Sequence, residues 1–136
     1  MASLRREVIE RAGGCCEYCL ASSADGALDF AIDHLIAEKH GGTTQLDNLG
    51  LSCYWCNSYK GSDISSVDWQ LDGAVVALFN PRRQQWNEHF KLEGLRIVPL
   101  TSTGRATAFL LQFNAPERIE ERRLLVELGV YPCQKE

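Results

Sequence analysis

Two pairs of cysteines have the spacing of a structural zinc site. Cys16 and Cys19 stand in "CEYC", and Cys53 and Cys56 stand in "CYWC". A Cys-x-x-Cys turn presents two thiolates to one ion, and two such turns complete the tetrahedron of a structural zinc. The 33 residues between the pairs (20–52) exceed the roughly 15–20 of simple zinc ribbons, so the metal would clamp a substructure. The alternative interpretation is that some of these cysteines are small buried hydrophobes.

Two further cysteines, Cys15 and Cys133, are left outside these pairs. Only Cys16 makes the three-residue step to Cys19, so we expect Cys15 not to bind the metal. The first residues, "MASLRREVIERAGG", are charged and lack the apolar core of a signal peptide, which predicts a cytoplasmic protein. Because cytoplasmic thiols are kept reduced, we expect Cys15 and Cys133 to be separate buried or surface thiols.

Composition predicts one soluble globular domain over 1–136. The chain has 45% hydrophobic and 24% charged residues, and it has no apolar run near the roughly 20 residues of a membrane span. The formal net charge is -4, but residues 1–81 carry 5 Lys+Arg against 11 Asp+Glu, whereas 82–136 carry 9 against 7. A nucleic-acid site would therefore be a local patch.

Short elements are predicted around the cysteine pairs. Apolar residues at helical spacing indicate a helix over 4–12, with Ser3 as N-cap and Gly13-Gly14 as its end. Alternation predicts a strand over 28–33, a glycine-containing loop follows, and a second extended piece is expected over 49–52. The segment 53–60, ended by Gly61, is typical of a short helix.

The C-terminal half gives a weaker pattern. We expect a turn at Asn80-Pro81 that opens a helix, an extended piece over 95–100, and a helix over 115–129 with Pro116 near its start. The periodicity of "ATAFLLQF" leaves helix and strand both open.

The run "IDHLIAEKHGGTTQLDNLGLSCYWCNSYKG" closely resembles the motif of the His-Asn-His (HNH) nucleases. The resemblance implies an α+β protein with a ββα-metal core at about 14–62, clamped by a four-cysteine zinc site, and this fold has the same strand, loop, strand, helix order. The segments "LFNPRRQQWNEHF" and "TSTGRATAFLLQFNAPERIEERR" resemble a C-terminal extension of bacterial members, expected here as a helical extension over about 63–136.

The resemblance also implies roles for four polar residues. His34 would be the general base that activates water, and Asp33 and Asn57 would hold a divalent metal at the scissile phosphate. Asn48 would brace the loop and help orient the His34 ring. Asn57 stands where the founding members have histidine, and an amide oxygen with a carboxylate suits a hard cation such as Mg²⁺ or Mn²⁺.

Five basic residues are candidate contacts to nucleic acid: His40, Lys60, Arg82, Arg83 and Arg105. Guanidinium groups match phosphate geometry, although each of these side chains has the alternative of being a solvated surface group. Four aromatic residues are interpreted as core rather than as platforms for bases: Trp86, Phe90, Phe109 and Phe113. His89 is interpreted as structural.

The sequence thus predicts a metal-dependent endonuclease that acts on DNA, most simply double-stranded DNA. Hydrolysis of a phosphodiester requires an activated water and neutralisation of charge on the phosphate, which a histidine and a bound metal supply. The main alternative is a catalytically silent zinc module that binds nucleic acid or protein. A redox or metal sensor that uses the six cysteines is a second alternative, but it leaves Asp33 and His34 unexplained.

Overall fold

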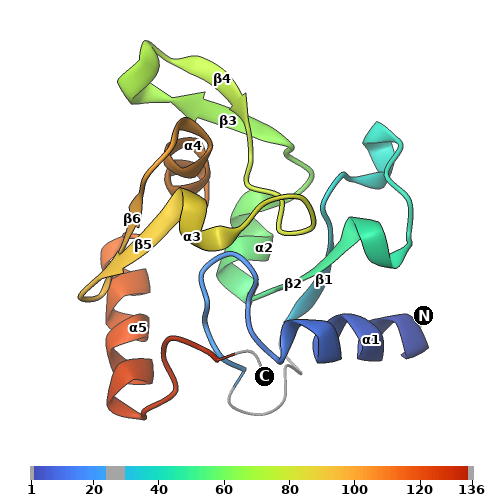
Figure 1. Ribbon diagram of the computed structural model, residues 1–136, viewed down its shortest axis with the longest axis horizontal. Coiled ribbons are helices and arrows are strands. Elements are labelled where there is room, and N and C mark those ends of the chain that lie inside the picture. The colour runs from blue at the N-terminus through green and yellow to red at the C-terminus, as the bar shows by residue number, and fades with distance from the viewer. Residues whose placement is uncertain (1, 24–29, 135–136) are drawn as a thin grey trace.

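The computed structural model describes residues 2–23 and 30–134, and it combines helices with small antiparallel sheets (Figure 1). Within these residues, no helix is long and apolar enough to cross a membrane. In chain order the helices and strands are α1 (Ala2–Ala12), β1 (Ala31–His34), β2 (Leu49–Ser52), α2 (Tyr54–Lys60), β3 (Ser65–Asp68), β4 (Ala74–Ala77), α3 (Trp86–His89), β5 (Phe90–Glu93), β6 (Arg96–Pro99), α4 (Ser102–Leu110) and α5 (Pro116–Glu127).

Strands β1 and β2 and helix α2 form the unit that carries the motif. The two strands pair antiparallel with Asp33 opposite Gly50 and His34 opposite Leu49. After β2 the chain passes through Cys53, which is the N-cap of α2, and the helix ends before Gly61. The predicted order of strand, loop, strand and helix is confirmed, although the first two residues of the predicted strand, 28 and 29, lie outside the described residues.

Helix α1 closes one side of this unit. Val8 and Ala12 pack against Leu49 and Leu51 of β2, and all four side chains are buried. The guanidinium of Arg11 donates hydrogen bonds to the backbone carbonyls of residues 46 and 49. These bonds attach the helix to the first residue of β2 and to the segment just before it. The predicted helix is confirmed, but it begins at Ala2, so Ser3 lies inside it rather than at its N-cap.

A second, larger core joins the cysteine segment to the C-terminal half. Phe79, Phe90 and Phe113 form successive edge-on ring contacts, and Tyr18 from the cysteine loop packs against Phe79. Phe90 and Phe113 are fully buried and Trp86 is partly buried against the same cluster, as expected. Phe109 is 60% exposed beside Trp69, so its assignment to the core was wrong.

The C-terminal half is less helical at its start than expected. It contains two hairpins, β3–β4 and β5–β6, with the four-residue helix α3 between them, and longer helices follow in α4 and α5 (Figure 1). The segment "ATAFLLQF", which the sequence left open between helix and strand, is mainly helical. Its first five residues belong to α4, which packs against β3. There, Arg105 makes a two-pronged ion pair with the buried carboxylate of Asp68 and lowers the pKa of that group to about 2.

Replacement of Leu51 tests the contact between α1 and β2. Leu51→Ala removes a fully buried side chain and leaves a cavity, so we expect the free energy of unfolding to fall by about 2–5 kcal/mol. Leu71→Ala is the matched control, because Leu71 is 53% exposed and its loss should change stability by less than about 0.5 kcal/mol. Denaturation at a fixed zinc concentration measures both; equal losses would contradict the assigned core.

Candidate active site

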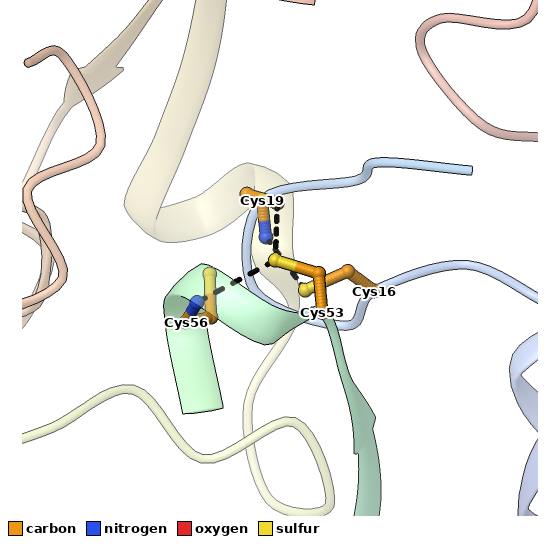
Figure 2. A group of neighbouring side chains, drawn as sticks. All are labelled: Cys16, Cys19, Cys53 and Cys56. Carbon is orange, nitrogen blue, oxygen red and sulfur yellow. Dashed lines mark hydrogen bonds between the residues drawn. The ribbon is translucent and has the colours of Figure 1, made fainter. Parts of the chain in front are cut away.

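The four paired cysteines meet in one buried cluster. Cys16 and Cys19 come from the loop after α1, and Cys53 and Cys56 come from the start of α2 (Figure 2). Their sulfur atoms all lie within 4.8 Å of one another, and the Cys19 and Cys53 sulfurs are 3.6 Å apart. Tetrahedral zinc with Zn–S bonds of about 2.3 Å places its sulfurs about 3.8 Å apart. The cluster therefore fits such an ion, and it is the one grouping of three or more His, Cys, Asp or Glu ligands in the described residues.

A buried arginine from α5 faces this cluster. Arg118 is 2% exposed, donates from Nη2 to the Cys56 sulfur over 3.3 Å and from Nη1 to the carbonyl of Leu111. Burial alone would lower its pKa, but the thiolates around it raise the pKa of Arg118 above its ordinary value. Four thiolates on a divalent ion would carry a net negative charge, and this guanidinium is placed to neutralise part of it. No sequence signal linked Arg118 to cysteines 62 residues away.

Cys15 and Cys133 form a disulfide, which corrects the expectation of two separate thiols. The reason is that the end of the chain returns to the cysteine loop. The Cys133 amide donates to the carbonyl of Leu20, and the Tyr131 hydroxyl donates to the carbonyl of Cys19 over 2.8 Å. These contacts bring together residues 118 positions apart, a pairing that spacing alone does not reveal. Cys15 is outside the four-cysteine cluster, as expected.

Asp33 is held from both sides by protein donors. Its side chain is 4% exposed, and it accepts a 2.7 Å hydrogen bond from the Tyr18 hydroxyl and a 3.1 Å contact from the Lys60 ammonium. Burial raises the pKa of Asp33 above its usual value even though Lys60 and Tyr18 act in the opposite direction. The carboxylate is thus fixed in orientation at the bottom of the site.

The His34 ring is partly accessible. Its side chain is 25% exposed, and Nε2 lies 2.9 Å from the Thr44 hydroxyl, which in turn donates to Glu38. Nδ1 has no hydrogen bond within the part of the chain that the structure describes. The ring is therefore oriented at one nitrogen and open at the other. Thr44, which sequence analysis did not single out, makes this contact.

Asn48 fixes the loop between β1 and β2. Its amide donates to the carbonyls of Ile36 and Thr43, and its side-chain oxygen accepts from the Ile36 amide. A Cβ on Gly42 would lie 1.7 Å from the Ile36 carbonyl oxygen, so this close approach requires glycine. Asn48 thus holds the loop as expected, whereas the contact to the histidine ring comes from Thr44.

Asp33, His34 and Asn57 line one open cavity of about 370 Å³, together with Glu38 and Lys39. The Asn57 side chain makes no hydrogen bond to any described residue. A carboxylate and a free amide oxygen suit a hard cation, and Mg²⁺ is usually bound by few protein oxygens with waters and phosphates completing its shell. The donor set fits a divalent metal of this kind.

The predicted basic contacts fall into two groups. Lys60 is 2% exposed and binds Asp33 and the His34 carbonyl, so it is an internal cation and its expected exposure to phosphate was wrong. Arg82 is paired with Glu17, and Arg105 is paired with Asp68. His40 and Arg83 lie on the surface.

His89 lies away from the cavity, whereas Lys39 lines it. His89 lies 2.6 Å from the Thr101 hydroxyl and packs against Phe79, in keeping with a structural residue. Lys39 lines the active-site cavity, although sequence analysis did not select it.

The HNH endonuclease family model matches residues 16–63. This segment holds the four-cysteine cluster and the residues that line the cavity, so the resemblance drawn from the motif is confirmed for residues 16–63. No curated protein and no solved structure matched the chain. The match to this family suggests a nuclease that acts on nucleic acid. The resemblance of the C-terminal extension stays a prediction.

Metal analysis tests the four-cysteine cluster. We expect one zinc per chain in the purified protein, and we expect Cys56→Ser to lose zinc and most of its stability because three thiolates cannot complete the tetrahedron. The control is the double variant Cys15→Ser with Cys133→Ser, which removes the disulfide and should keep full zinc content. Elemental analysis and thermal unfolding with and without chelator give the result; full zinc in Cys56→Ser would contradict the assigned ligands.

Arg118 can be tested separately from the cysteines. Arg118→Met removes the charge and the hydrogen bond to Cys56, so we expect zinc affinity to fall about 10–100-fold, the usual effect of outer groups that support a metal ligand. Arg123→Met is the matched control on the same helix, because Arg123 pairs only with Glu120 and Glu127 among the described residues. Competition with a chromogenic chelator measures both affinities, and equal values for the two variants would count against this role.

Proposed function

We propose that the protein is a metal-dependent endonuclease that hydrolyses phosphodiester bonds in DNA, with double-stranded DNA as the substrate. The observation that carries the proposal is the shared cavity in which Asp33, His34 and Asn57 meet. The family match over the same segment supports the reaction class. The proposed metals are Zn²⁺ in the four-cysteine cluster and Mg²⁺ or Mn²⁺ at Asp33 and Asn57.

In the proposed mechanism, His34 takes a proton from the attacking water. An imidazole has an unperturbed pKa of about 6.5, which suits a base at neutral pH. The hydrogen bond at Nε2 with Thr44 holds the ring in place while the other nitrogen is open to the water. Asp33 and Asn57 would hold the divalent metal, which supplies positive charge at the phosphate and at the leaving 3′ oxygen.

Basic side chains near the cavity favour a phosphate substrate, although the overall charge of the chain does not. Lys39 is the exposed cation at the cavity wall, while His40 and Arg83 lie on the surface as proposed further contacts. The overall charge of -4 is unfavourable for a polyanion. Binding to DNA should therefore be weak and should fall steeply with salt, so low ionic strength is the right starting condition.

One observation favours the alternative of a silent zinc module. The Asp33 carboxylate already has a buried cation beside it, because the Lys60 ammonium lies 3.1 Å away. In such a module this pair would be purely structural, and the protein would bind nucleic acid or protein without cleaving it.

We further propose that 1–136 act as a single domain in the cytoplasm. The shared aromatic core, which joins Tyr18 to Phe79, Phe90 and Phe113, supports one folding unit.

Cleavage of supercoiled plasmid tests the nuclease directly. Zinc-loaded protein should nick or linearise the plasmid with Mg²⁺ or Mn²⁺ and not with EDTA. Because His34 is the proposed base, His34→Ala should reduce the rate by about two orders of magnitude or more at unchanged zinc content. Asp33→Ala and Asn57→Ala should lose activity as well, and His89→Gln is the control because His89 does not line the cavity.

The outcomes separate the two functions. Normal cleavage by His34→Ala would remove this histidine from the mechanism. Inactivity of the wild type with every metal, together with one bound zinc and retention of DNA in a gel shift, would favour the silent module.

A further inference from the structure

We propose that Tyr18 is a positioning residue that links the four-cysteine cluster to the catalytic metal site by fixing the carboxylate of Asp33. The inference rests on the proposed metal role of Asp33 and adds a residue outside the motif. Tyr18 stands between Cys16 and Cys19, so its backbone is part of the turn that presents two metal ligands.

The tyrosine is held rigidly along its whole length. Its side chain is 1% exposed and packs edge-on against Phe79, and its carbonyl accepts a 2.7 Å hydrogen bond from the Trp86 indole. The hydroxyl donates to Oδ2 of Asp33 over 2.7 Å, which is within the usual range for a hydroxyl that donates to a carboxylate oxygen. A ring fixed at its base and along its face can place this hydroxyl accurately.

The second oxygen of Asp33 is held by a lysine on the helix that carries the other cysteine pair. Lys60, at the end of α2, contacts Oδ1 over 3.1 Å, and the start of the same helix carries Cys53 and Cys56. The four-cysteine cluster thus anchors the segments that carry both donors to Asp33, Tyr18 and Lys60. Each carboxylate oxygen has two lone-pair directions, so one direction on each remains for a divalent cation after these bonds are made.

The hydroxyl is needed for this purpose and not for packing. Phenylalanine would fill the same apolar space against Phe79, whereas only the phenol group reaches Asp33. Without it, the carboxylate would be held by Lys60 at one oxygen alone and would lose part of its preorganisation for the metal. Removing the hydroxyl should therefore weaken binding of the catalytic metal while the four-cysteine cluster stays filled.

The test is Mn²⁺ binding by zinc-loaded Tyr18→Phe, followed by electron paramagnetic resonance or calorimetry without DNA. We expect the dissociation constant for Mn²⁺ to rise about 10–100-fold with one zinc per chain retained. In plasmid cleavage the half-saturating Mn²⁺ concentration should rise in parallel, while the rate at saturating Mn²⁺ stays close to that of the wild type.

Tyr131→Phe is the matched control. Tyr131 also donates its hydroxyl to the cysteine loop, at the carbonyl of Cys19 over 2.8 Å, but it makes no contact with Asp33 among the described residues. Its removal disturbs the same loop, so Mn²⁺ binding should remain within about twofold of the wild type if the Asp33 contact is what matters.

Three results would overturn the inference: unchanged Mn²⁺ affinity in Tyr18→Phe, loss of zinc from that variant, or a wild type that binds no Mn²⁺. Failure of the nuclease proposal gives a different pattern. A wild type that binds Mn²⁺ but does not cleave DNA would refute the enzyme, and weaker Mn²⁺ binding by Tyr18→Phe would still support the role of Tyr18.

Discussion

The four-cysteine cluster is the constraint on which the active site depends. The HNH unit consists of two four-residue strands and a seven-residue helix, and isolated helices shorter than about 12–15 residues are marginal in water. Helix α2 is nevertheless needed at a defined position, because it carries Asn57 and Lys60. Cys53 and Cys56 attach its first turn to the loop of Cys16 and Cys19, and binding of a metal there would contribute directly to the free energy of folding.

The C-terminal half contributes contacts to the four-cysteine cluster. Arg118 supplies a buried positive charge to the cluster, and Tyr131 binds the backbone of one of its ligands. Phe90 and Phe113 extend the same core to the ring of Tyr18 through Phe79. These contacts of the extension are with the cysteine cluster and the core around it, and none of its described residues lines the cavity of Asp33, His34 and Asn57.

Local signals in the sequence predicted the elements and the ligands, whereas long-range pairings escaped them. The cysteine spacing and the alternation before Asp33 gave the strand, loop, strand, helix order, since both are properties of neighbouring residues. Lys60 was misjudged because helix termini are usually exposed, and only the fold shows that its ammonium turns inward to Asp33. Arg118 and the Cys15–Cys133 disulfide were missed for a related reason, since their partners are distant in the chain.

The Asp33–Lys60 pair explains how Asp33, the proposed metal ligand, can be buried without a bound metal. An isolated carboxylate with 4% exposure would strongly destabilise the fold. Buried charges are tolerated in protein interiors only when each is paired with an opposite charge and hydrogen-bonded. Lys60 provides the opposite charge and Tyr18 provides a hydrogen bond, so Asp33 keeps its orientation in the metal-free protein. The same pair limits how strongly a cation is attracted, because one positive charge is already present. Asn57 is neutral and free of hydrogen bonds to described residues, so in the proposed site the substrate phosphate would supply the remaining negative charge that a divalent ion needs. If the proposed metal site is correct, the metal and the nucleic acid should therefore bind cooperatively, each completing the site for the other.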